Sequence, residues 1–185
     1  MNLLSLALLP LTADHGWPEL ARRHAPLHRL LLLLVLPLTL LPPLMLYYAG
    51  NHYPEVFLRG AQQKDWAEVA IVFFCAEWIT LLGMGWLIRQ AAATYSLTID
   101  YHDAFLLAGI APVPMWLSSL GLLIPSFWVN AFIATLGLGL ACGLMYQGLR
   151  ALGRQREEIV AGSIVQIVIG VGLIAWALLL VFAFH

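Results

Sequence analysis

Five long runs of apolar residues, separated by short polar segments, dominate the chain. They lie at about residues 27–48, 66–88, 103–124, 127–149 and 159–184. A helix needs about 20 mostly apolar residues to cross the hydrocarbon core of a bilayer. The pattern therefore predicts an all-α integral membrane protein. We expect residues 27–185 to form a bundle of five transmembrane helices, and residues 1–26 to form a short cytoplasmic segment at the membrane interface.

Composition supports a membrane location and excludes other classes of protein. Of the 185 residues, 62% are hydrophobic and 10% are charged, and the mean hydropathy is +0.86. A soluble domain has roughly a quarter of charged residues. The net charge is -1 and no basic run is present, so nucleic-acid binding is not expected. The two cysteines lie in apolar runs and suggest no disulfide framework.

Prolines interrupt two of the predicted spans and join two others. Because proline lacks an N–H, we expect kinks in the first and third spans, at Pro37, Pro42, Pro43, Pro112 and Pro114. The third and fourth spans are separated by the three residues "PSF". Pro125 should end one helix and Ser126 should cap the next, which predicts a tight antiparallel hairpin.

The basic residues predict the orientation of the chain in the membrane. The loops on the N-terminal side contain seven arginines, at positions 22, 23, 29, 89, 150, 154 and 156, and the other side has only Arg59 and Lys64. This asymmetry places the N-terminus in the cytoplasm and His185 outside. Ahead of the first span, Trp17 and Leu20 are expected in the lipid headgroup layer, with Arg22 and Arg23 facing phosphates. The alternative is a frayed terminus that binds nothing.

Glu77 lies in the middle of the second predicted span, in the stretch "AIVFFCAEWITLLGMGW". An ionised carboxylate there costs at least ~2.5 kcal/mol, and apart from Arg29 at the start of the first span no lysine or arginine lies within a span to neutralise it. We therefore expect a neutral carboxyl that donates a hydrogen bond, with Thr80 one turn away on the same face. The alternatives are proton or ion handling, and contact with another subunit.

Two further patterns have a structural and a functional interpretation. Gly139 and Gly143 are spaced for close helix approach, and packing within the monomer is favoured over dimerisation. Asp100, His102 and Asp103 begin the third span, where helix capping is favoured over a metal or proton site. No motif of a serine hydrolase, zinc protease or P-loop nucleotidase is present, so an enzyme and a bound cofactor are not expected.

The third and fourth spans, together with the lead-in to the first, resemble a known family. The stretch "DAFLLAGIAPVPMWLSSLGLLIPSFW" has small residues leading into Pro112 and Pro114, and it ends near Pro125 and Trp128. The fourth span ends in "LMYQGLR", which contains Tyr146 and Gly148. These patterns resemble the Yip family, the Ypt/Rab-interacting membrane proteins, in particular its small bacterial inner-membrane branch.

The resemblance implies a five-span helical protein without catalytic residues. It suggests membrane organisation or scaffolding through contacts with lipids, with other membrane proteins or with further copies of the chain. The short N-terminal segment argues against binding of a Rab-type GTPase. The alternative function is a small proton- or ion-coupled transporter or channel subunit that uses Glu77. The expected location is the bacterial inner membrane.

Overall fold

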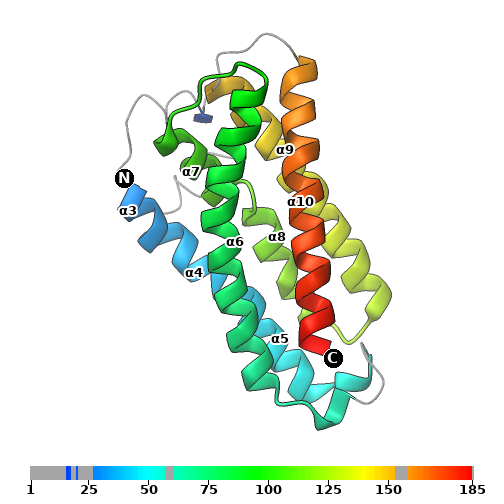
Figure 1. The fold of residues 1–185 in the computed structure, drawn as a ribbon. Coiled ribbons are helices and arrows are strands. Elements are labelled where there is room, and N and C mark those ends of the chain that lie inside the picture. The colour runs from blue at the N-terminus through cyan, green and yellow to red at the C-terminus, as the bar shows by residue number, and fades with distance from the viewer. Residues whose placement is uncertain (1–15, 18–19, 21–26, 57–60, 153–157, 185) are drawn as a thin grey trace.

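The computed structural model describes residues 16–17, 20, 27–56, 61–152 and 158–184, and every regular element in these ranges is helical. Five of its segments are long and apolar enough to cross a membrane: Leu27–His52, Trp66–Thr94, Tyr101–Leu123, Phe127–Leu152 and Ile159–Leu178. They form an elongated bundle (Figure 1). The predicted fold class, an all-α membrane protein with five transmembrane helices, is confirmed.

The first span consists of four short helical pieces. These are α3 (Leu27–Leu30), the π-helical η1 (Leu31–Val35), α4 (Leu36–Thr39) and α5 (Leu41–His52). Leu40 separates α4 from α5, just before Pro42 and Pro43. These prolines cannot donate to the carbonyls of Leu38 and Thr39, so the helix changes its course there.

The second span is one continuous helix, α6 (Trp66–Thr94). Asp65 caps it, because its Oδ1 accepts hydrogen bonds from the backbone N–H groups of Ala67 (2.9 Å) and Glu68 (3.3 Å). At the other end Ser96 adopts a left-handed conformation with φ of 58°, and the N–H of Leu97 donates to the carbonyl of Ala92 (2.9 Å). This arrangement ends the helix and turns the chain into the third span.

The third span lies at the centre of the bundle and is broken where the sequence predicts. It comprises α7 (Tyr101–Ile110), α8 (Val113–Ser118) and the 3-10 helix η4 (Ser119–Leu123). Every residue of α7 from Ala104 to Ile110 is buried. The break falls at Ala111 and Pro112, between α7 and α8. A helix this apolar on all sides belongs inside a bundle, and α7 packs against α6, α9 and the first span.

The third and fourth spans form the predicted tight hairpin. After η4 the chain turns within three residues into α9 (Phe127–Leu152), which packs against α8. The structure records the turn's side-chain hydrogen bonds at Asn130, whose Nδ2 donates to the carbonyls of Ile124 and Ser126 (both 2.8 Å). The fifth span, α10 (Glu158–Phe184), packs against α6 and α9.

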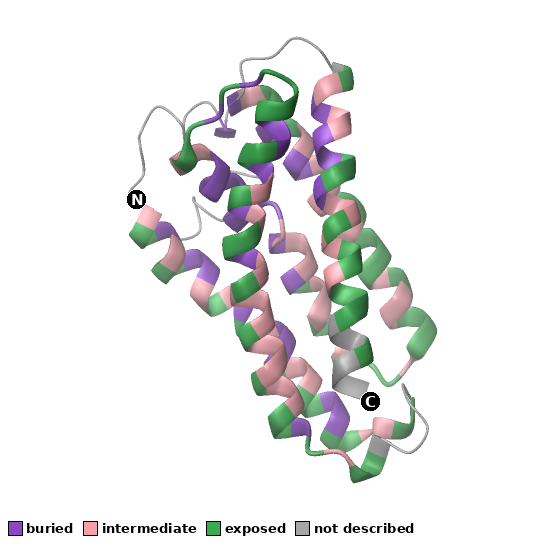
Figure 2. Cartoon of the chain, in the orientation of Figure 1, coloured by how far each residue is buried: buried purple, intermediate pink, exposed green. Residues whose placement is uncertain are grey.

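The core lies around α7, at the end of the bundle where α6 turns into α7. Figure 2 shows buried residues concentrated in that half, whereas α9 and the far half of α10 present exposed residues. The exposed side chains on these helices are largely apolar, including Trp128, Phe132, Ile174 and Leu178. Such faces are compatible with lipid or with another protein inside a membrane.

The structure corrects the prediction made for Trp17 and Leu20. Both side chains are buried, each with 2% of its surface exposed, and both belong to the core cluster around α7. They therefore contact protein rather than lipid headgroups. Arg22 and Arg23 lie outside the described residues. The physical reason is local, since Gly148 on α9 leaves room for the Trp17 ring: a β-carbon added there would lie 3.1 Å from the ring.

Candidate functional site

Glu77 lies on the inward face of α6. It is one turn before Leu81 and two turns before Gly85, both of which are buried, and it shares this face with the buried Ile88. The Oε2 atom of its carboxyl has no solvent contact and no hydrogen-bond partner among the described residues. The predicted hydrogen bond is thus not found for Oε2. A buried carboxyl oxygen without a partner is costly and is a frequent feature of functional sites.

Thr80, the other member of the predicted polar pair, does not direct its proton to Glu77. Its hydroxyl donates to the carbonyl of Ala76 (2.7 Å) within α6. Other span hydroxyls behave alike, because each donates to a carbonyl three or four residues earlier in its own span: Ser118 to Met115, Ser119 to Trp116, Thr135 to Ala131 and Ser163 to Ile159. The sequence identified the polar residues, but these hydroxyl donors are used locally.

Thr39 is a buried polar residue that the sequence patterns did not single out. Its side chain is completely buried, with 0% exposure, and its hydroxyl donates to the carbonyl of Leu36 (3.1 Å). Among the described residues, Thr39 is the one polar residue that is buried as a whole. The one signal in the sequence was an isolated hydroxyl in the run "LLLLLVLPLTLLPPL". Because hydroxyl groups in spans usually bond locally, that signal alone predicts no site.

The glycines of α9 fall into two groups, and one group contradicts the prediction. A β-carbon added at Gly137 would lie 2.9 Å from the Cβ of Ser118 and 3.0 Å from the carbonyl oxygen of Pro114, so this glycine permits close packing of α8 and α9. Gly139 and Gly143 have no described atom within 4 Å of such a position. The expectation that these two glycines pack inside the monomer is wrong, because the face that carries them points away from α8.

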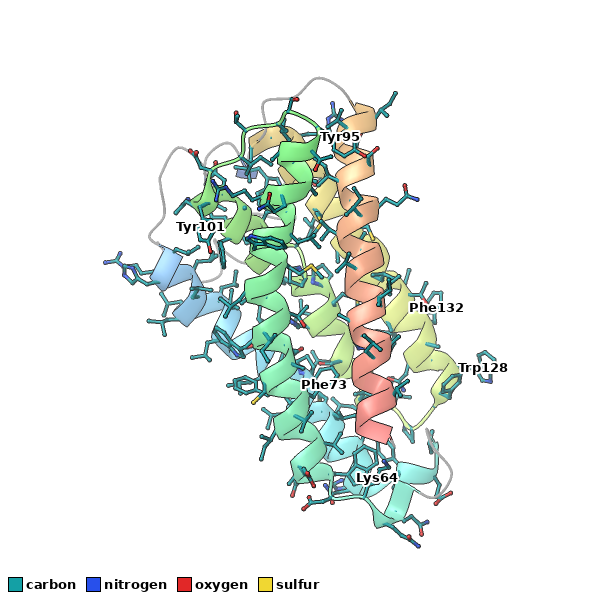
Figure 3. All side chains as sticks on the ribbon, in the orientation of Figure 1. Lys64, Phe73, Tyr95, Tyr101, Trp128 and Phe132 are labelled. Atoms are coloured by element: carbon teal, nitrogen blue, oxygen red, sulfur yellow. The ribbon has the colours of Figure 1, made fainter. Side chains whose placement is uncertain are left out.

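The remaining residues of the family pattern have diverse environments. Pro112 and Pro114 lie at the break of the third span, and Pro125 lies in the hairpin turn. Gly148 is buried against Leu107 and Trp17. Figure 3 shows Trp128 and Phe132 projecting from the outer side of α9, and Trp128 is 80% exposed.

Tyr146 lies half-buried near the end of α9. The guanidinium of Arg150, one turn further on, lies over its ring at 5.7 Å from the centroid. This is a cation–π contact at the end of a span, where an arginine can still reach the membrane surface.

The polar residues at the start of α7 form a modest cluster. Asp100 occupies the N-cap position with extended backbone, but its side chain makes no capping hydrogen bond. Asp103 lies in the first turn, and its Oδ1 is 3.4 Å from Nδ1 of His102. Within the described ranges, no three side chains of histidine, cysteine, aspartate or glutamate come together in a way that could hold a metal ion. Asp100 therefore occupies the predicted capping position, but its side chain does not form the capping hydrogen bond.

Comparison with known proteins gives one match. A family model described as the Yip1 domain matches residues 7–181, which is nearly the whole chain and includes all five spans. No curated protein and no solved structure matches.

Proposed function

The chain belongs to the Yip1 domain family, a non-enzymatic membrane family, and from this premise we propose that it organises the membrane through contacts with other membrane proteins. The single observation that supports the proposal is the open glycine face of α9. Gly139 and Gly143 are four residues apart and have no described neighbour at their β-positions. Small residues at this spacing let two helix backbones approach closely within a bilayer.

The surroundings of the two glycines support helix contact rather than a purely lipid-facing surface. Thr135 lies one turn before Gly139 on the same face, and Tyr146, which packs against the core, lies one turn after Gly143. Exposed aromatic residues, Phe132 and Trp128, continue the face toward the hairpin turn. A partner helix with small residues could pack closely against this glycine face, and a second copy of α9 has such residues. Lipid contacts would cover the rest of the exposed apolar surface.

Replacing Gly143 by leucine tests this role. Gly143→Leu places a large side chain on the glycine face and keeps another helix from approaching closely, so we expect a several-fold lower yield of chemical crosslinks between this chain and its neighbours in native membranes. The matched control is Gly83→Leu on α6, because Gly83 is also open at its β-position but has no second glycine four residues away. Equal crosslink yields for both variants and the unaltered chain would refute the proposal.

We infer a cytoplasmic N-terminus from the seven-to-two distribution of basic residues, and a bacterial inner membrane from the resemblance to the small bacterial branch of the family. In a cysteine-free background, a cysteine placed at Lys64 should react with a membrane-impermeant maleimide added to intact cells. A cysteine at Arg154 should react only after the membrane is opened. The reverse pattern would contradict the orientation.

Ion-coupled transport through Glu77 is the second candidate function, because Oε2 of this carboxyl is buried without a partner. Its test is proton and cation flux in liposomes, and equal flux with the unaltered chain and with Glu77→Gln would reject it.

A further inference from the structure

A series of contacts holds the side chain of Arg89 against the start of α7. Phe105 packs on α6 at Gly85, where an added β-carbon would lie 2.8 Å from its ring. The centroids of the Phe105 and Tyr101 rings are 4.6 Å apart. The guanidinium of Arg89 lies over the Tyr101 ring, 5.8 Å from its centroid. This cation–π contact fixes the direction of an exposed arginine where α6 and α7 pack against each other.

The position of Arg89 along α6 matches one surface of a bilayer. Between Glu68 and Arg89, the continuous helix α6 has Glu77 as its one charged residue. At a rise of about 1.5 Å per residue this stretch is about 32 Å long, close to the roughly 30 Å thickness of the hydrocarbon core. Arg89 and the Tyr101 ring beneath it therefore lie at the level of the lipid headgroups, where tyrosine side chains are enriched.

From Arg89 toward the bilayer centre, α6 has an exposed apolar stripe. The stripe consists of Ile79, Leu82 and Trp86, all of which are exposed. Together with Arg89 they follow the three- and four-residue spacing of one helix face. A lipid acyl chain extended along this stripe would bring its phosphate to the level of the Arg89 guanidinium.

A negative group lies beside this arginine without being paired to it. Asp100 directly precedes Tyr101 and is exposed. Its side chain makes no capping hydrogen bond, and among the described residues its carboxylate forms no ion pair with Arg89 or with any other group. The next acid, Asp103, has its Oδ1 3.4 Å from Nδ1 of His102. The headgroup level thus has a cation and an anion close together, and both can interact with a ligand.

These two charges select the kind of headgroup. The planar guanidinium of arginine matches phosphate oxygens with paired N–H donors. The nearby carboxylate repels a purely anionic headgroup and attracts an ammonium group. In phosphatidylethanolamine an ethylene link joins the phosphate to a primary ammonium, so a single headgroup can meet both residues. The ammonium of phosphatidylcholine is fully methylated and has no N–H to donate to the carboxylate.

The geometry points to a binding site for phosphatidylethanolamine where α6 meets α7. Arg89 binds the phosphate, the Asp100 carboxylate accepts hydrogen bonds from the ammonium group, and an acyl chain follows the apolar stripe of α6. Tyr101 is a positioning residue, because its ring holds the guanidinium in place. The site goes beyond the contacts proposed for α9 and does not depend on them.

Photolabelling of the purified full chain in lipid nanodiscs tests the site. A phosphatidylethanolamine with a diazirine in one acyl chain is added in trace amount to phosphatidylcholine, and mass spectrometry of peptides locates the adducts. We expect adducts on the α6 peptide that contains Leu82 and Trp86. Unlabelled phosphatidylethanolamine should lower their yield several-fold more than the same amount of phosphatidylglycerol. Free phosphoethanolamine should have little effect, because it lacks the acyl chain.

Matched variants make the test specific. Arg89→Gln should lower the adduct yield several-fold, whereas Arg29→Gln should not, because Arg29 is an exposed arginine at the start of the first span and outside this site. Asp100→Asn should keep the labelling but lose the preference for phosphatidylethanolamine over phosphatidylglycerol. Tyr101→Phe keeps the ring and should keep the labelling, whereas Tyr101→Leu should lower it.

Four results would overturn the inference. These are equal competition by phosphatidylethanolamine and phosphatidylglycerol, an unchanged yield in Arg89→Gln, strong competition by free phosphoethanolamine, and adducts spread evenly over the exposed faces of all spans. Gly143→Leu should leave the labelling unchanged. The lipid site and the proposed contacts of α9 can therefore fail independently of each other.

Discussion

Glu77, Thr80 and Thr39 have different positions and different uses of their hydrogen-bonding groups. Thr80 and Thr39 donate to carbonyls of their own helices, at 2.7 and 3.1 Å, so their donors are satisfied. Glu77 keeps a buried oxygen without a partner among the described residues. Leaving a buried polar group unpaired costs about 1–3 kcal/mol. Replacing Glu77 by an apolar residue should therefore increase the free energy of unfolding.

Replacing Glu77 by leucine should stabilise the protein. Leucine removes the unpaired polar group and keeps most of the packed volume, so we expect a gain of about 1–3 kcal/mol in the free energy of unfolding. Denaturant unfolding in detergent measures it. Glu68→Gln, at an exposed position, should change stability by less than about 0.5 kcal/mol. A clear loss of stability in Glu77→Leu would show that the carboxyl makes a favourable interaction.

The turn between η4 and α9 is stabilised by the side chain of Asn130, a role that the sequence analysis did not predict. Pro125 and Ser126 occupy the turn as predicted. The recorded side-chain bonds, however, come from Asn130, which reaches back to two carbonyls of the turn. Close packing of α8 and α9 also requires Gly137, whose added β-carbon would meet the backbone of Pro114. The hairpin is thus fixed by contacts that arise only once the chain has turned.

Replacing Asn130 by alanine should loosen this hairpin. Two carbonyls, those of Ile124 and Ser126, would lose a donor, and we expect a loss of about 1–2 kcal/mol in unfolding free energy. Thr135→Ala is the matched control on α9, because its exposed hydroxyl only bonds within its own helix. Thermal unfolding of both variants in the same detergent gives the comparison. Equal unfolding midpoints for the two variants would show that Asn130 does not stabilise the hairpin.

The whole molecule has a packed half around α7 and a half in which helix faces are open. Trp17 and Leu20, which precede the first span in sequence, join the packed half, so this core extends beyond the five spans. The open half includes α9 with its two unpartnered glycines and exposed aromatic residues. This division separates a part that stabilises the fold from a part that can meet lipid or another protein.

Removing the Trp17 ring tests the extent of this core. Trp17→Ala should lower the unfolding free energy by about 3–5 kcal/mol, as is common when a buried large aromatic side chain is truncated. Trp128→Ala removes an equally large ring from an 80% exposed position and should cost less than about 1 kcal/mol. If the two variants unfold alike, Trp17 belongs to the interface as the sequence suggested, and the packing described above is not maintained.

The sequence by itself determined the class of protein and the order of its spans. Runs of about 20 apolar residues leave few alternatives. Every backbone N–H and C=O group that crosses lipid must be hydrogen-bonded within the protein, and only helices and closed barrels achieve this. Prolines likewise located the breaks at Leu40 and Pro112 and the hairpin at Pro125. These features depend on local chemistry, namely hydropathy over a window and a missing N–H, which a single stretch of sequence already contains.

Only the tertiary structure decided which side chains meet. The spacing of Gly139 and Gly143 is compatible with an inner or an outer face, and the packing of α8 on Gly137 turned them outward. The burial of Trp17 depends on the space at Gly148, which is far away in the chain. Such relations depend on helix register and rotation, for which an apolar sequence has little direct signal because most of its faces are hydrophobic.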